Sequence, residues 1–172
     1  MSVQTQELQE RTEGKSLYNY QKGAIDKIFT CFEEAPDNYH LLYQLPTGGG
    51  KTVIFSEIVR QYLKTRQKQV LVMTHRIELC RQTSRMLSEF GVSNKVIDSK
   101  ADLSDQGDYN CFVAMVETLN NRLNDNKLDI SDIGLVIIDE AHNLRTEIKA
   151  TYEFCRPHIK SFRTALDIGC DE

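Results

Sequence analysis

Apolar residues along this chain alternate between helical stripes and short continuous runs. From Ala24 to Phe32 they recur at three- and four-residue intervals, which is the spacing of one helical face. A short apolar run follows at residues 41–43, and helical spacing returns from Ile54 to Tyr62. A glycine cluster separates that run from the second stripe. This stretch therefore predicts a helix, a strand, a glycine-rich loop and another helix.

The alternation continues through most of the remaining sequence. Strand-like runs lie at residues 70–73, 96–97, 111–116 and 135–138, and helical stripes at residues 79–90 and 117–123. The runs are continuous rather than alternating in polarity, which is typical of strands buried on both faces. Helices between such strands imply right-handed crossovers and a parallel sheet. The sequence predicts an α/β domain of three layers, with the Asp-rich residues 98–108 as an exposed loop.

Length and composition limit the classes of protein that need to be considered. A chain of 172 residues fits one domain of about 150 residues, which we place at 17–172, and the polar residues 1–16 predict a mobile leader. The longest apolar run, 111–116, is far shorter than the roughly 20 residues of a membrane-spanning helix. Five cysteines without a C-x-x-C pair favour reduced thiols, and hence the cytoplasm.

Charge argues against binding of nucleic acid by the molecule as a whole. The net charge is -4, so the bulk field repels a phosphate backbone. A local basic excess nevertheless lies between Arg60 and Arg85, where seven basic residues are opposed only by Glu78. This excess is either a solvated helical face or part of a local site.

The glycine-rich loop carries the residue types that hold the phosphates of a nucleotide: Thr47, Gly48, Gly49, Gly50, Lys51 and Thr52. Glycines let backbone N–H groups turn toward a phosphate, and the following helix directs its positive end at the same anion. Lys51 supplies a charge for the β and γ phosphates, and the Thr52 hydroxyl can hold Mg²⁺. Leu45 stands where the strict pattern has a glycine, so the match is to a variant form.

An acidic pair follows the apolar run 135–138. Such a pair lies at the carboxyl edge of the sheet, where open α/β folds bind their ligands. Asp139 is suited to hold Mg²⁺, and Glu140 to orient and deprotonate the water that attacks the γ phosphate. An ordinary helix N-cap is the alternative for an isolated acidic pair, but here the pair lies about ninety residues after a phosphate loop.

These motifs, in this order, resemble the first RecA-like domain of superfamily-2 helicases of the DEAH type, a group that includes type III restriction-enzyme motor subunits. The resemblance implies ATP and Mg²⁺ as ligands. It also assigns Gln21, in the segment 17–21, to the adenine edge, with stacking on the base by Tyr18. An exposed residue at a helix start is the alternative for Gln21.

Three further roles come from the resemblance alone. Arg76 and Thr118 follow two of the strands and correspond to residues that touch the backbone of the tracking nucleic-acid strand. His142 corresponds to the residue that couples the nucleotide site to the nucleic-acid site. A surface ion pair for Arg76 and a helix N-cap for Thr118 are the alternatives.

The resemblance weakens toward residue 172. The next family motif is expected near residues 164–166, where its last hydroxyl is missing. Residues 165–170 also resemble the first motif of Rossmann-like methyltransferases through Asp167 and Gly169, or form a plain terminal strand. We expect a truncated chain without the second motor domain, which a partner chain would supply in trans.

The leading hypothesis is a nucleic-acid-dependent ATPase domain that acts on DNA rather than RNA. Intact Lys51, Thr52, Asp139 and Glu140 favour this enzyme. The alternatives are a nucleotide-dependent binding or regulatory module with little hydrolysis of its own, and a truncated gene product.

Overall fold

The computed structural model describes residues 17–34, 40–45, 50–74, 76–124, 128–138, 153 and 163–169. Its helices are α2 (Asn19–Glu34), α3 (Lys51–Thr65), α4 (Ile77–Glu89) and α5 (Val116–Asn124). Its strands are β1 (His40–Leu45), β2 (Gln69–Thr74), β3 (Lys95–Ile97), β4 (Cys111–Met115), β5 (Ile133–Ile138) and β6 (Arg163–Gly169). The helices and strands predicted from periodicity are thus confirmed. The predicted leader lies outside the described residues.

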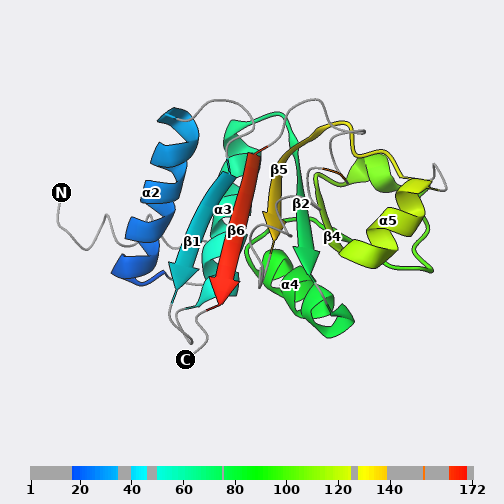
Figure 1. Ribbon diagram of the computed structural model, residues 1–172, viewed down its shortest axis with the longest axis horizontal. Coiled ribbons are helices and arrows are strands. Elements are labelled where there is room, and N and C mark those ends of the chain that lie inside the picture. The colour runs from blue at the N-terminus through cyan, green and yellow to red at the C-terminus, as the bar shows by residue number, and fades with distance from the viewer. Residues whose placement is uncertain are drawn as a thin grey trace.

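The strands form one sheet in the order β1-β6-β5-β2-β4-β3, and every neighbouring pair is parallel (Figure 1). Parallel neighbours require crossover connections, which α3, α4 and α5 provide after β1, β2 and β4, whereas a loop with the short 3-10 turn Gln106–Asp108 connects β3 to β4. The carboxyl ends of the strands therefore meet at one edge of the sheet. That edge is where the predicted motifs follow β1, β2, β4 and β5.

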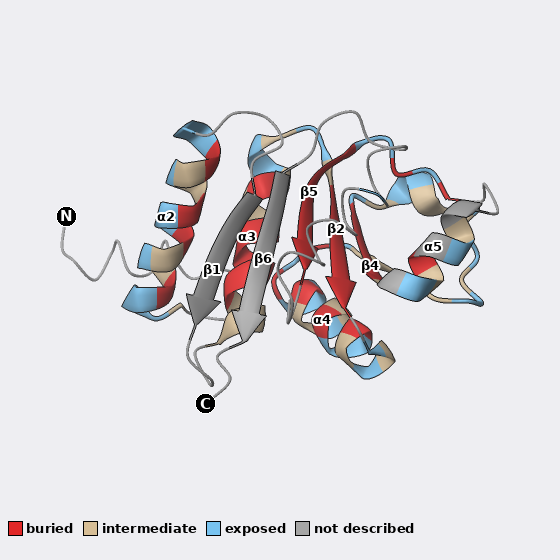
Figure 2. Cartoon of the chain, in the orientation of Figure 1, coloured by how far each residue is buried: buried red, intermediate tan, exposed pale blue. Residues whose placement is uncertain are grey.

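Helices cover both faces of this sheet, as the unbroken apolar strands predicted. Val70 and Val72 of β2 belong to a core shared with α2, α3 and α4, whereas Leu71 and Met73 belong to a second core that contains Leu119 of α5. Successive residues of a strand point to opposite faces, so each core takes every second residue. Figure 2 shows that the strands β2, β4 and β5 consist almost entirely of buried residues. The three-layer α/β prediction is confirmed.

Strand β6 lies inside the sheet, between β1 and β5. Thr164 is in register with His40, the first residue of β1, and Gly169 with Leu45, the last one. Residues 164–166, where we expected a family motif, therefore belong to the first half of β6, away from the carboxyl edge. The residues of β6 nearest the glycine-rich loop are those that lead to Gly169. Residues 165–169 belong to this strand, which both interpretations of the segment contain, so the choice between them stays a prediction.

The Asp-rich loop is held to the end of the sheet by α5. The Arg122 guanidinium donates hydrogen bonds to the carbonyl oxygens of Asp98, at 3.0 and 3.2 Å, and Ala101, at 2.7 Å. The Lys95 ammonium, in β3, forms an ion pair with the Asp105 carboxylate of this loop, at 2.6 Å. These contacts order a segment whose sequence alone predicted only exposure.

Within the described ranges, none of the helices is both long enough and apolar enough to cross a membrane.

Candidate nucleotide and nucleic-acid site

Gly50 joins the glycine-rich loop to helix α3. Its backbone is left-handed, with φ 73° and ψ 43°, and its carbonyl oxygen accepts the first helical hydrogen bond from Ile54, at 3.0 Å. Glycine adopts this conformation without the steric cost that a Cβ brings. No side chain among the described residues caps this end of α3. Its first N–H groups and its positive dipole are therefore suited to an anion.

Lys51 and Thr52 are the first two residues of α3, and both are partly buried. Strand β1 ends at Leu45, so the predicted order of strand, loop and helix is present. Thr47, Gly48 and Gly49 lie outside the described residues.

Gln21 packs against the end of this loop. It lies in the first turn of α2, only 3% exposed, and its Oε1 accepts a hydrogen bond from the Tyr18 N–H, at 2.9 Å. Its Nε2 occupies the space that a Cβ on Gly50 would need. The structure thus brings together the predicted adenine-reading residue and the last glycine of the loop. The alternative of an exposed Gln21 is excluded by its burial.

Two exposed tyrosines precede Gln21 within three residues. Tyr18 is 70% exposed and Tyr20 53%, and their rings are parallel, with centroids 6.0 Å apart and 7° between the ring planes. Exposed aromatic faces beside a buried amide are the residue types that contact a base.

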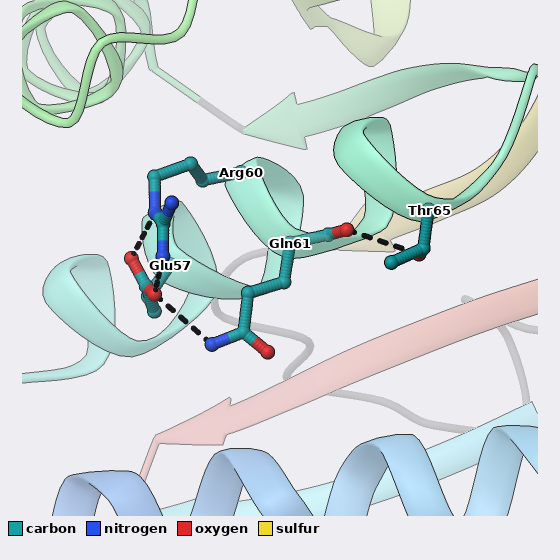
Figure 3. Close-up of polar contacts among 4 residues, drawn as sticks. All are labelled: Glu57, Arg60, Gln61 and Thr65. Carbon is teal, nitrogen blue, oxygen red and sulfur yellow. Dashed lines mark hydrogen bonds and ion pairs between the residues drawn. The ribbon is translucent and has the colours of Figure 1, made fainter. Parts of the chain in front are cut away.

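Helix α3 contains an ion pair between the buried Glu57 and the partly exposed Arg60. Arg60 donates to both carboxylate oxygens of Glu57, at 2.7 and 2.5 Å, and Gln61 adds a third bond at 3.0 Å (Figure 3). The Thr65 hydroxyl donates to the Gln61 carbonyl at 3.0 Å. Glu57 is 1% exposed, and its hydrogen bond raises the pKa of Arg60. A buried carboxylate with three donors is satisfied, so this cluster stabilises α3 as the support of the loop.

The basic residues between Arg60 and Arg85 differ in whether other side chains already contact them. Arg60 is committed to Glu57, and the Arg66 guanidinium lies 5.5 Å from the centre of the Tyr62 ring. Arg76, Arg81 and Arg85, by contrast, are exposed at or along α4. Lys64 and Lys68 are also exposed, at the end of α3 and in the loop before β2, so of these basic residues Arg76 is the one directly after the carboxyl end of β2.

Arg76 and Thr118 follow neighbouring strands. Thr74, the last residue of β2, is in register with Met115, the last residue of β4. Arg76 is the exposed N-cap of α4, and Thr118 is partly buried in the first turn of α5. The fold therefore brings both predicted nucleic-acid contacts to one edge.

Strand β5 ends at Ile138, directly before the acidic pair. Ile138 is in register with Met73 of β2 and Leu166 of β6, so β5 is central in the sheet. Asp139, Glu140 and His142 lie outside the described residues.

One feature of the site has no signal in the sequence. The Ser56 hydroxyl, one helical turn after Thr52, is fully buried and has no hydrogen-bond partner among the described residues. Serine is common on exposed helix faces, so its burial became visible only with the packing of α3.

Comparison with known proteins places this fold and site in a family. The model of the family "Type III restriction enzyme, res subunit" matches residues 14–169. The chain belongs to this family. A putative ATP-dependent helicase, IRC3 of Saccharomyces cerevisiae, is 35% identical over 152 residues, which are 84% of this chain and 21% of that protein. The replication restart protein PriA of Chlamydia pneumoniae is 30% identical over 139 residues, which are 75% of this chain and 17% of that protein.

Solved structures agree on the fold. The UvsW helicase from bacteriophage T4 aligns with a TM-score of 0.62 and 20% identity, over 95% of this chain and 58% of that one. The type ISP restriction-modification enzyme LlaGI, solved with a DNA substrate mimic, aligns with a TM-score of 0.66 and 18% identity, over 89% of this chain and 17% of that one. The fold is therefore that of a RecA-like helicase motor domain. The chain spans about a fifth of the length of the curated relatives named above.

Proposed function

We propose that this chain is the first motor domain of a nucleic-acid-dependent ATPase that acts on DNA. The observation that carries the proposal is the strand, loop and helix from β1 to α3, with left-handed Gly50 directly before Lys51 and Thr52. That arrangement suits phosphate binding, and the family match places it in a helicase-type domain. The preference for DNA is supported by the similar fold of LlaGI, which was solved with a DNA substrate mimic.

The residues at the loop fit Mg-ATP chemically. The left-handed backbone of Gly50, a helix N-terminus that no described side chain caps, and the Lys51 ammonium all favour a polyphosphate. The Thr52 hydroxyl and the Asp139 carboxylate are oxygen donors of the kind Mg²⁺ takes. When bound, Mg²⁺ neutralises charge that develops on the phosphates.

In this proposal each of the site residues has one role. Lys51 holds the β and γ phosphates, and Glu140 accepts a proton from the attacking water. Gln21 reads the adenine edge and the exposed Tyr18 ring stacks on the base; the position of Gln21 beside Gly50 supports this assignment. Arg76 and Thr118 bind the nucleic-acid backbone, and His142 connects the two sites. A second motor domain, in this protein or a partner, would supply the arginine that stabilises the transition state.

Titration with a fluorescent ATP analogue tests the nucleotide site. Lys51→Ala removes a charge-assisted contact and should cost about 1.5 to 3 kcal/mol of binding free energy. Lys64→Ala, at the exposed far end of the same helix, is the matched control and should bind like wild type. Equal affinities for Lys51→Ala and Lys64→Ala would exclude the glycine loop as the nucleotide site.

A second substitution separates binding from hydrolysis. Glu140→Gln keeps size and hydrogen bonding but removes the base, so nucleotide affinity should stay within a few fold while any hydrolysis falls. Steady-state ATPase with and without single-stranded DNA measures this. Binding of nucleotide without detectable hydrolysis in wild type would favour the binding module over the enzyme.

A further inference from the structure

A buried hydrogen-bonded chain connects the end of β2 to the start of α4. Thr74 Oγ1 lies 2.8 Å from the Cys80 Sγ and 3.2 Å from the Arg76 carbonyl oxygen. That oxygen also accepts a hydrogen bond from the Cys80 N–H, at 3.1 Å. Thr74 is 1% exposed and Cys80 0%, so water does not compete for these groups. The Thr74 side chain therefore acts on the Arg76 carbonyl directly, and the Cys80 side chain acts on it only through Thr74.

The direction of each bond follows from the available protons. A carbonyl oxygen only accepts, so the single hydroxyl proton of Thr74 is donated to Arg76. The Cys80 S–H must then donate to Thr74 Oγ1. Burial raises the pKa of the Cys80 thiol, which keeps that proton in place. The chain of donors runs from Cys80 through Thr74 to the Arg76 carbonyl.

Arg76 needs such support because of its place in the fold. It is the N-cap of α4, with an extended backbone at φ -133° and ψ 144°, and its own side chain makes no cap hydrogen bond. The side chain is exposed, so packing does not orient it. The orientation of its peptide is set instead by the two donors on the carbonyl oxygen.

We propose that Thr74 is a positioning residue, which holds Arg76 in the orientation that contacts the nucleic-acid backbone, with the Cys80 thiol orienting the Thr74 hydroxyl. The proposal rests on the proposed function, because it assumes that Arg76 makes that contact. A purely structural Thr74 would stabilise the junction of β2 and α4 without affecting binding.

The test measures binding of a fluorescent single-stranded oligonucleotide by the full chain through anisotropy. Thr74→Val removes the hydroxyl at nearly constant volume, and Thr74→Ser keeps it. Loss of one hydrogen bond predicts about fivefold weaker binding for Thr74→Val and near wild-type binding for Thr74→Ser. Thr83→Val makes the same chemical change at a buried threonine of α4 and should leave binding unchanged.

The dependence on Arg76 separates positioning from stability. In an Arg76→Ala background, Thr74→Val should cause no further loss of affinity, because the contact that it positions is gone. If Arg76→Ala weakens binding but Thr74→Val does not, the positioning role is wrong and the proposed function stands. If Arg76→Ala binds like wild type, the contact itself is wrong, and the positioning role fails with it.

A second pair of variants applies if Thr74→Val does not fold. Cys80→Ala removes the donor that orients the Thr74 hydroxyl, and we expect about twofold weaker binding from a weak S–H bond. Cys80→Ser retains a donor and should bind like wild type. Equal binding by Cys80→Ala and Cys80→Ser, at equal folded fraction, contradicts the role of the thiol.

Discussion

Substitution of Gly50 by alanine probes the contact between the phosphate loop and α2. Gly50 has φ 73°, and a side chain in this region costs about 1 to 2 kcal/mol. A Cβ here would also overlap Gln21 Nε2, and Gln21 cannot shift freely because its Oε1 binds the Tyr18 N–H. Displacing that side chain adds roughly one lost hydrogen bond, about 1 kcal/mol. We expect Gly50→Ala to lower the free energy of unfolding by about 2 to 3 kcal/mol.

Gly91 offers a matched control for the backbone term. It has nearly the same φ, 75°, but a Cβ there meets nothing within 4 Å. Gly91→Ala should therefore cost only the backbone strain of about 1 to 2 kcal/mol. Urea unfolding followed by circular dichroism measures both variants, and equal m-values would show that the same surface unfolds.

The double variant isolates the overlap. In a Gln21→Ala background the space beside Gly50 is open, so Gly50→Ala should cost no more than Gly91→Ala. The two substitutions would then be less than additive by about 1 kcal/mol. If Gly50→Ala costs the same with and without Gln21, this contact does not constrain the loop.

Two further predictions concern buried polar groups. Ser56→Ala removes a buried hydroxyl that has no partner in the described part of the chain, so the free energy of unfolding should rise by about 1 kcal/mol. Thermal unfolding should show a higher melting temperature, and a lower one would mean that Ser56 has a partner. Burial raises the pKa of Cys111 to about 12 and also raises that of Cys80, so at pH 8 both thiols should stay protonated in the folded protein. Iodoacetamide with peptide mass mapping should label the partly exposed Cys31 and spare these two, whereas labelling of Cys111 at the rate of Cys31 would contradict its burial.

Much of the fold was readable from the sequence because it depends on local patterns. The stripe from Ile54 to Tyr62 predicted α3, since the period of apolar residues reflects a face that must be buried. Continuous runs such as that of β2 predicted strands covered on both sides, which the two cores confirm. The position of Lys51 and Thr52 at a helix start likewise followed from the glycines before it.

Tertiary structure alone decided which segments meet. Strand β6, last in the chain, lies between β1 and β5, and its register moves residues 164–166 away from the carboxyl edge. Gly134 is required because a Cβ there would overlap the Tyr62 hydroxyl, in α3, and Lys68, in the loop before β2. A sequence pattern records whether a residue is buried but carries no information on its distant neighbours.

The same limit separates the chemistry that the sequence determined from the chemistry that it could not. The glycine-rich loop and the residues that follow the strands are set by short motifs, so their types and order were evident. The contact of Gln21 with Gly50, and the hydrogen bond between Thr74 and Cys80, could not be predicted from the sequence. Arg60 counted as one more basic residue until the turn of α3 brought it onto Glu57. Hydrogen bonds and ion pairs require distances of about 3 Å, and only the folded backbone sets these distances.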